Sequence, residues 1–258
     1  MQFIKNNLFS LFLFSALSFS LSSYLISSPL NDNFYIYSYL RGIPLAEGNI
    51  KLKLKSNKYS IALEAKSTGV FSLLLDWSQI IKSYGNIEEK KFKSLRYRSS
   101  DSRGKKNGHI EIDFSNKLPK IISAQPDPSK DKRRNINISY LSDVNDPAAG
   151  IFNLALAECQ NTVKIFDGKR RYNIKVLKKE NSILKNSALG EENINAINCS
   201  YKIERIAGYT KKELEKFPKE GNLWIKKHKQ LGIFYPIKIQ IKTKWGYFLC
   251  LIKEGEYK

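Results

Sequence analysis

Three cysteines, at positions 159, 199 and 250, are the side chains of this sequence best suited to covalent chemistry. Cys159 follows a helix-like segment and Cys199 lies in a strand-like one, so either the two form a disulfide or they are separate buried thiols. We expect the disulfide, because the N-terminal residues predict export to an oxidising compartment. Closing that loop would stabilise the fold by roughly 3–4 kcal/mol. Cys250 lies in the apolar segment FLCLI and is expected to be a small core residue.

Histidines and carboxylates suggest one metal site, which the spacing does not support. His109, Glu111 and Asp113 share one face of a predicted strand. Strand neighbours two residues apart need ligands from elsewhere to close a site, and the second histidine, His228, is far away in sequence. We therefore expect a solvated outer face here, and the sequence predicts no metal and no other cofactor.

No catalytic motif is present in the sequence. It has no G-x-S-x-G segment and no glycine-rich phosphate loop. Hydrolases of the cell wall can work with only two carboxylates, so an enzyme of this kind is one alternative. The acids available for it are Glu47, Glu64, Asp76, Glu111 and Asp113. Ordinary surface acids are the simpler interpretation, and we predict no catalytic residues.

The N-terminus has the pattern of a secretory signal. Met1–Asn7 is polar and carries one positive charge at Lys5, and Leu8–Ile26 is apolar or small throughout. We predict a signal peptide over residues 1–23, with an uncleaved membrane anchor as the alternative, since 19 residues nearly span a bilayer. Both interpretations place the remaining chain outside the cytoplasm, and we expect a periplasmic protein.

The chain is strongly basic, with a formal net charge of +20. Such a charge attracts anionic envelope components such as lipid head groups or acidic polysaccharide. The lysines are spread over many segments, and the abundance of Lys, Asn and Ile together is also what a low-GC genome produces. Nucleic acid is not an expected partner. Export separates the protein from cytoplasmic nucleic acid, and no cluster of arginines with aromatic residues is present.

Short alternating segments predict a mainly β protein. Ile50, Leu52 and Leu54 alternate with lysines, and Asp167-Gly168 joins two further strands as a hairpin turn. We also predict strands at Val70–Trp77 and at 136–140. About a dozen strands describe a sandwich or an open barrel, with residues 30–258 as one domain. A transmembrane barrel is not favoured, because the chain does not end in the pattern typical of one.

Helical signals occur at two places in the exported part. Asp146-Pro147 is a helix start, and the following AAGIFNLALAEC suits one short buried helix. Lys211–Phe217 predicts one or two exposed helical turns.

Several segments together resemble a known family, the bacterial periplasmic domain of unknown function DUF3108. They are LRGIPLAEG with the following YSIALEAKSTGVF, the Asp-Pro helix start before Cys159, VKIFDGKRRYNIKVL, and Cys199 with the later IAG and YPIKIQ. The resemblance covers nearly all of the chain after the signal, and FDGKRRY with the flanking cysteines is its most specific part. It implies an envelope protein with a curved antiparallel sheet and carries over no catalytic residues.

Three functions are compatible with these patterns. We expect a non-catalytic envelope protein that binds an apolar or amphiphilic, lipid-like ligand in a half-open β cradle. The alternatives are a scaffold that docks other envelope proteins and the cell-wall hydrolase with paired carboxylates. The basic outer faces and the segment Lys211–Glu220 look particular to this chain.

Overall fold

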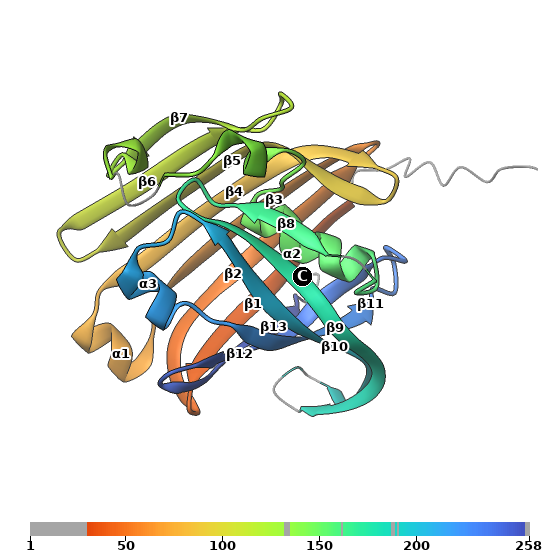
Figure 1. Ribbon diagram of the computed structural model, residues 1–258. Helices are drawn as coiled ribbons and strands as arrows, with labels where there is room; N and C mark the ends of the chain where they lie inside the picture. Colours follow the sequence, from red (N-terminus) through yellow and green to blue (C-terminus); the bar gives the residue numbers. More distant parts are fainter. Residues whose placement is uncertain (1–29, 132–134, 161, 187–188, 190, 256–258) are drawn as a thin grey trace, which may run out of the picture.

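The computed structural model describes residues 30–131, 135–160, 162–186, 189 and 191–255 (Figure 1). The first strands are β1 (Leu30–Leu40), β2 (Ile43–Lys55), β3 (Lys58–Ser67), β4 (Trp77–Glu88), β5 (Lys91–Arg103), β6 (Lys106–Asp113) and β7 (Lys120–Gln125). The later ones are β8 (Val163–Phe166), β9 (Arg171–Asn186), β10 (Glu191–Ala207), β11 (Glu220–Lys227), β12 (Phe234–Thr243) and β13 (Gly246–Glu254). The α-helices are α1 (Gly69–Leu74), α2 (Pro147–Leu156) and α3 (Lys211–Lys216). The described residues also include 3-10 helices at Pro128–Lys130 and Ile138–Leu141.

All thirteen strands form one antiparallel sheet, in the order β7-β6-β5-β4-β3-β2-β1-β13-β12-β11-β10-β9-β8. Strands that follow one another in the chain pair with each other, except for β7 and β8, and β1 also pairs with β13, so the first and last strands lie side by side at the centre. Among the described residues no ladder joins β7 to β8, so the sheet is curved but not closed. This confirms the predicted open antiparallel sheet.

The sheet curls around α2, which lies on its concave side (Figure 1). Phe152 packs with Tyr59 and Phe92, and the Phe92 ring stacks on that of Tyr59 with centroids 4.3 Å apart. Leu154 and Ala155 pack on the other side of the helix against β8–β11. The predicted buried helix is therefore confirmed, and in the described residues its side chains occupy part of the concave side that was expected to be an open cradle.

Two polar side chains hold α2 in this position. Asp146 caps the helix by accepting hydrogen bonds from the backbone N–H groups of Ala148 and Ala149, at 2.9 and 3.1 Å. Its second oxygen accepts from the hydroxyls of Ser83 and Ser94, at 2.7 and 2.6 Å, so it links the helix to β4 and β5. Burial raises the pKa of Asp146, and these four hydrogen bonds oppose the rise.

Asn153 makes the second link between α2 and the sheet. Its side-chain amide accepts from the backbone N–H of Phe92 and donates to the Phe92 carbonyl, both at 2.7 Å. Asn153 thus pairs with the backbone of β5 as a neighbouring strand would, which fixes the angle of the helix against the sheet.

The outer face of β2 carries lysines, as predicted. Ile50, Leu52 and Leu54 are 5%, 1% and 3% exposed, whereas the lysines between them face solvent. The terminal strand β8 has a backbone partner on its outer edge. The N–H of Asn145 donates to the carbonyl of Lys164, and the carbonyl of Asn145 accepts from the N–H of Phe166. The backbone of Asn145 therefore occupies the outer edge of β8.

Two predicted strands are wrong. Val70–Trp77 is not a strand: residues 69–74 form α1, which has no buried residue, and β4 begins only at Trp77. Positive φ at Gly69 turns the chain out of β3, and the run of apolar residues that follows has no polar alternation to place it on a sheet. At 136–140, the Asn137 side chain accepts from the N–H of Ser139 and starts a 3-10 helix instead.

The predicted signal peptide lies outside the described residues. Across 30–255, apart from the gaps named above, no helix is long and apolar enough to cross a bilayer.

Candidate functional site

The predicted disulfide between Cys159 and Cys199 is confirmed. Their Cα atoms are 6.2 Å apart, and the bond joins the chain just after α2 to β10. Both residues are buried among Leu154, Leu223 and their neighbours, so the disulfide is part of the core rather than of a reactive site.

Cys250 is the free thiol, on β13. Burial raises the pKa of this thiol to about 11, although a hydrogen bond with Ser38 opposes the shift. Since only the thiolate is a good nucleophile, Cys250 has little reactivity near neutral pH.

The carboxylates that the sequence offered to a metal or a hydrolase are mostly engaged in ion pairs. Glu111 lies 3.2 Å from Arg96 and 3.0 Å from Arg98, and Asp113 lies 3.8 Å from Arg96. Hydrogen bonds from Ser115 lower the pKa of Asp113 further. In the part of the chain that the structure describes, no group of three or more His, Cys, Asp or Glu side chains is placed to hold a metal ion.

The remaining acids do not form a catalytic pair either. Glu47 contacts Lys66 at 3.5 Å on the outer face. Glu64 lies on β3 and Asp76 lies in the loop between α1 and β4; both are exposed. The structure does not bring these three acids together with Glu111 and Asp113 in one cleft.

His228 belongs to a buried structural cluster. Its Nδ1 accepts from the backbone N–H groups of Gln230 and Leu231, so the proton of a neutral ring is on Nε2. Nε2 lies 3.3 Å from Asp32 and 3.7 Å from Glu254. The ring thereby fixes the turn between β11 and β12 to β1 and β13.

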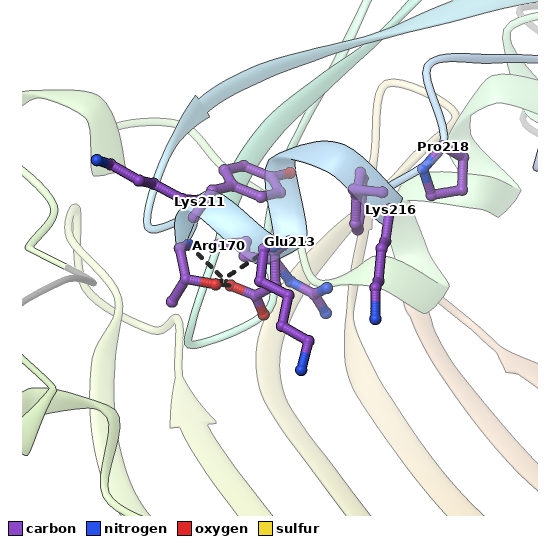
Figure 2. A pocket seen from close by; sticks show the side chains of 9 residues that line it. Arg170, Lys211, Glu213, Lys216 and Pro218 are labelled. Atoms are coloured by element: carbon purple, nitrogen blue, oxygen red, sulfur yellow. Dashed lines mark hydrogen bonds between the residues drawn. The ribbon is translucent and has the colours of Figure 1, made fainter. Parts of the chain in front are cut away.

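One cavity in the described part of the chain lies beside α3, at one end of the sheet. It measures about 900 Å³ and opens to solvent. Aromatic residues and Pro218 form its apolar part, and Arg170 and three lysines form its charged part (Figure 2). Its lining consists of Arg170, Tyr209, Thr210, Lys211, Lys212, Glu213, Lys216, Phe217 and Pro218. We call it the α3 pocket.

Local sequence explains why α3 forms at this place. The Thr210 side chain accepts from the N–H of Glu213, and the Glu213 carboxylate accepts from the N–H of Thr210, which is a capping box. Phe217 ends the helix and turns its ring inward, with its centroid 5.1 Å from that of Tyr209 and 5.7 Å from that of Tyr172. The predicted exposed helical turns at Lys211–Phe217 are thus confirmed.

Arg170 connects the aromatic part of the pocket to its charged part. Its guanidinium lies 4.9 Å from the centre of the Phe217 ring, in a cation–π contact. Nε donates to Asp167 at 2.9 Å and Nη2 forms an ion pair with the same carboxylate at 2.8 Å, which fixes the side chain. Among the described residues Nη1 makes no hydrogen bond, so part of the guanidinium is still available to an acceptor.

Tyr209 adds a polar group to the aromatic part. Its hydroxyl is buried and has no hydrogen-bond partner in the described portion of the protein. Burial is also the main reason why the pKa of Tyr209 is raised, so the phenol stays neutral and can donate.

The charged part of the α3 pocket is mainly positive. Within the described ranges Lys211, Lys212 and Lys216 form no ion pair, whereas Glu213 is engaged in the capping box. Figure 2 shows Lys211 and Lys216 extending from α3 in different directions around Glu213. An aromatic wall beside several unpaired cations suits a ligand with an apolar body and an anionic group.

This pocket was not predicted from the sequence. Two signals were visible: Arg170 lies in FDGKRRY, the most specific part of the family resemblance, and Lys211–Glu220 looked particular to this chain. Arg170 reaches α3 because Arg171 on β9 lies opposite Ala207 on β10. That register joins residues far apart in sequence and has no local signature.

These features define a class: a mainly β protein with one open antiparallel sheet that curls around an internal helix. The chain belongs to the family described as "Protein of unknown function (DUF3108)", which matches residues 33–250. One similar solved structure is the "Beta-barrel-like Protein of Domain of Unknown Function DUF1849 from Brucella abortus". It is 8% identical, with a TM-score of 0.46, and the match covers 89% of this chain and 98% of that one. No curated protein matches the sequence.

Proposed function

We propose that this protein is a non-catalytic component of the cell envelope that binds an anionic amphiphile in the α3 pocket. The observation that carries the proposal is the arrangement at Arg170, where a cation with a free N–H group stacks on Phe217 beside unpaired lysines. An acidic head group would meet the cations, and its apolar part would lie against the aromatic rings.

The proposed binding site differs from the one that the sequence suggested. In the described residues α2 and its neighbours occupy much of the concave side of the sheet, where the sequence suggested an open cradle. The α3 pocket lies at an end of the sheet and is open to solvent, so a ligand can enter without unfolding the core.

The confirmed disulfide supports residence in the periplasm, because such bonds persist in oxidising compartments. The N-terminal signal pattern supports the same location.

The test is to purify the protein from its own envelope and identify bound lipids by native mass spectrometry and solvent extraction. We expect an acidic amphiphile to co-purify. The variant Lys211→Gln/Lys212→Gln/Lys216→Gln should lose most of it, because these lysines carry the unpaired charge of the pocket.

A matched control is Lys51→Gln/Lys53→Gln/Lys55→Gln, which removes the same charge from the outer face of β2. It should retain the ligand if the pocket, rather than net charge, determines binding. A natural protein that never carries lipid, or two triple variants that lose it equally, would contradict the proposal.

A further inference from the structure

Apolar side chains project from several turns at one end of the sheet. On α1, Val70, Leu73 and Leu74 are 64%, 85% and 84% exposed, in a segment with no buried residue. Several large apolar side chains are rarely exposed together on a protein surface unless that surface contacts a partner or a membrane.

Neighbouring turns extend this apolar surface. The register places the β1–β2 turn between α1 and the β12–β13 turn, because Leu40 lies opposite both Ile43 and Phe248. Ile43, Trp245 and Tyr247 are 52%, 52% and 54% exposed. We call the residues of these three turns, together with the adjacent β5–β6 turn at Gly104-Lys105, the turn rim.

The turn rim is held in place by backbone hydrogen bonds. The N–H of Thr68, just before α1, donates to the carbonyl of Leu45, and the N–H of Arg41 donates to the carbonyl of Tyr247. The N–H of Gly104 donates to the carbonyl of Asp76. The apolar tips are therefore fixed at one end of the sheet, where α1 is labelled at the lower left of Figure 1.

Basic side chains surround these apolar tips and outnumber the acidic ones. The basic residues of the rim and the strand ends next to it are Arg41, Lys66, Arg103, Lys105, Lys106 and Lys244. The acidic ones are Glu47, Asp76 and Asp101, of which Glu47 pairs with Lys66 and Asp101 with Arg103.

We propose that the turn rim docks onto a bilayer surface that contains anionic lipids. Apolar tips enter the region between head groups and acyl chains, Trp245 and Tyr247 lie at the level of the head groups, and the basic residues contact lipid phosphates. A bilayer fits better than a protein, because separate apolar tips along one end of a sheet, with basic side chains around them, match a flat and deformable anionic surface.

The α3 pocket opens at this same end of the sheet, since α3 follows β10 where β10 lies opposite the start of β11. The rim proposal does not depend on a ligand in that pocket, and its test uses no ligand.

A local probe tests the docking on the full chain. An environment-sensitive fluorophore is attached to Leu73→Cys in a Cys250→Ser background, and to Leu177→Cys in the same background as control. Leu177 is 59% exposed on β9, away from the rim. Vesicles contain equal parts of phosphatidylglycerol and brominated phosphatidylcholine, or brominated phosphatidylcholine alone.

We expect the probe at position 73 to shift to the blue and lose most of its emission on the anionic vesicles. The probe at position 177 should change little, and the neutral vesicles should have a much weaker effect. The quenching reports only on the position of the probe, so membrane binding through another part of the chain would not quench the probe at position 73. No quenching at either position, or equal quenching at both, would overturn the proposal.

A second measurement introduces Leu73→Glu/Leu74→Glu and follows the quenching of a probe elsewhere on the rim, on the same vesicles and in the Cys250→Ser background. Because neither leucine packs in the fold, the variant should melt as the natural protein does but lose rim binding, seen as roughly tenfold weaker quenching of a probe at Ile43→Cys. The control Leu177→Glu/Ile183→Glu changes exposed residues of β9 and should bind normally. A charged α1 that leaves the quenching unchanged would contradict the proposal.

Discussion

At the scale of single residues, the carboxylate of Asp146 determines how the inside of the molecule is built. It is fully buried and satisfies two backbone donors of α2 and two serine hydroxyls of the sheet. A second Asp-Pro pair, Asp127-Pro128, begins a 3-10 helix at the surface. There the Asp127 side chain accepts a hydrogen bond from the N–H of Ser129. The two residues have the same capping role and differ in burial.

Replacing Asp146 by alanine should destabilise the protein by roughly 3 kcal/mol or more, because it removes a helix cap and leaves buried donors without acceptors. Asp127→Ala should cost only about 0.5–1 kcal/mol, since water replaces the lost acceptor. Chemical denaturation of both variants measures the difference. Equal losses would show that the buried network adds nothing to ordinary capping.

At the scale of elements, the disulfide connects the end of α2 to β10 across the core. The positive φ of Cys159, 59°, shows that the helix has ended where the bond begins. The bond therefore restricts the unfolded chain over a loop that contains β8 and β9.

We expect Cys159→Ala/Cys199→Ala to lower the free energy of unfolding by about 3–4 kcal/mol, the loop-closure value for this length. The reference is Cys250→Ala, which removes a thiol without opening a loop and should cost less. Urea unfolding under non-reducing conditions provides both values. A double variant as stable as the natural protein would mean that the bond has no effect on the folded molecule.

The sequence predicted those elements whose signals are local. Alternation with lysine predicts β2, Asp146-Pro147 predicts α2, and Asp167-Gly168 predicts the turn from β8 to β9. The strand predicted at Val70–Trp77 was wrong because these apolar residues suit a strand, a buried helix and an exposed turn equally well. Only the complete fold determines which surface they contact. The α3 pocket was not predicted for a related reason, because it depends on the register of β9 on β10.

At the scale of the whole molecule, side-chain packing joins β8, at one end of the strand order, to β5 and β6 near the other end. Phe166 at the end of β8 packs with Tyr97, Ile110 and Ile112 of β5 and β6. The turn that follows approaches so closely that a Cβ on Gly168 would lie 2.1 Å from the Cδ1 of Ile110.

Gly168→Ala should therefore destabilise the protein by roughly 2–4 kcal/mol, from the strain of φ 87° and from the clash. Gly104→Ala is the matched control, because Gly104 also has positive φ but has nothing within 4 Å of the added Cβ. It should cost only about 1–2 kcal/mol.

Thermal unfolding of the two glycine variants is the measurement. Ile110→Val removes the clashing Cδ1, so adding it to Gly168→Ala should cost less than the sum of the two single changes. Strictly additive losses would contradict this close approach.

The backbone of Asn145 along β8 also limits how copies of this chain can join. A fibre of stacked sheets grows only if each molecule offers two open edges, one for the copy ahead and one for the copy behind. With the outer edge of β8 occupied, a further copy cannot add there, and the open edges of the described sheet are those of β7 and of β9 beyond Ile174, where β8 has ended. Strand addition between copies is therefore restricted to β7 and to this outer part of β9.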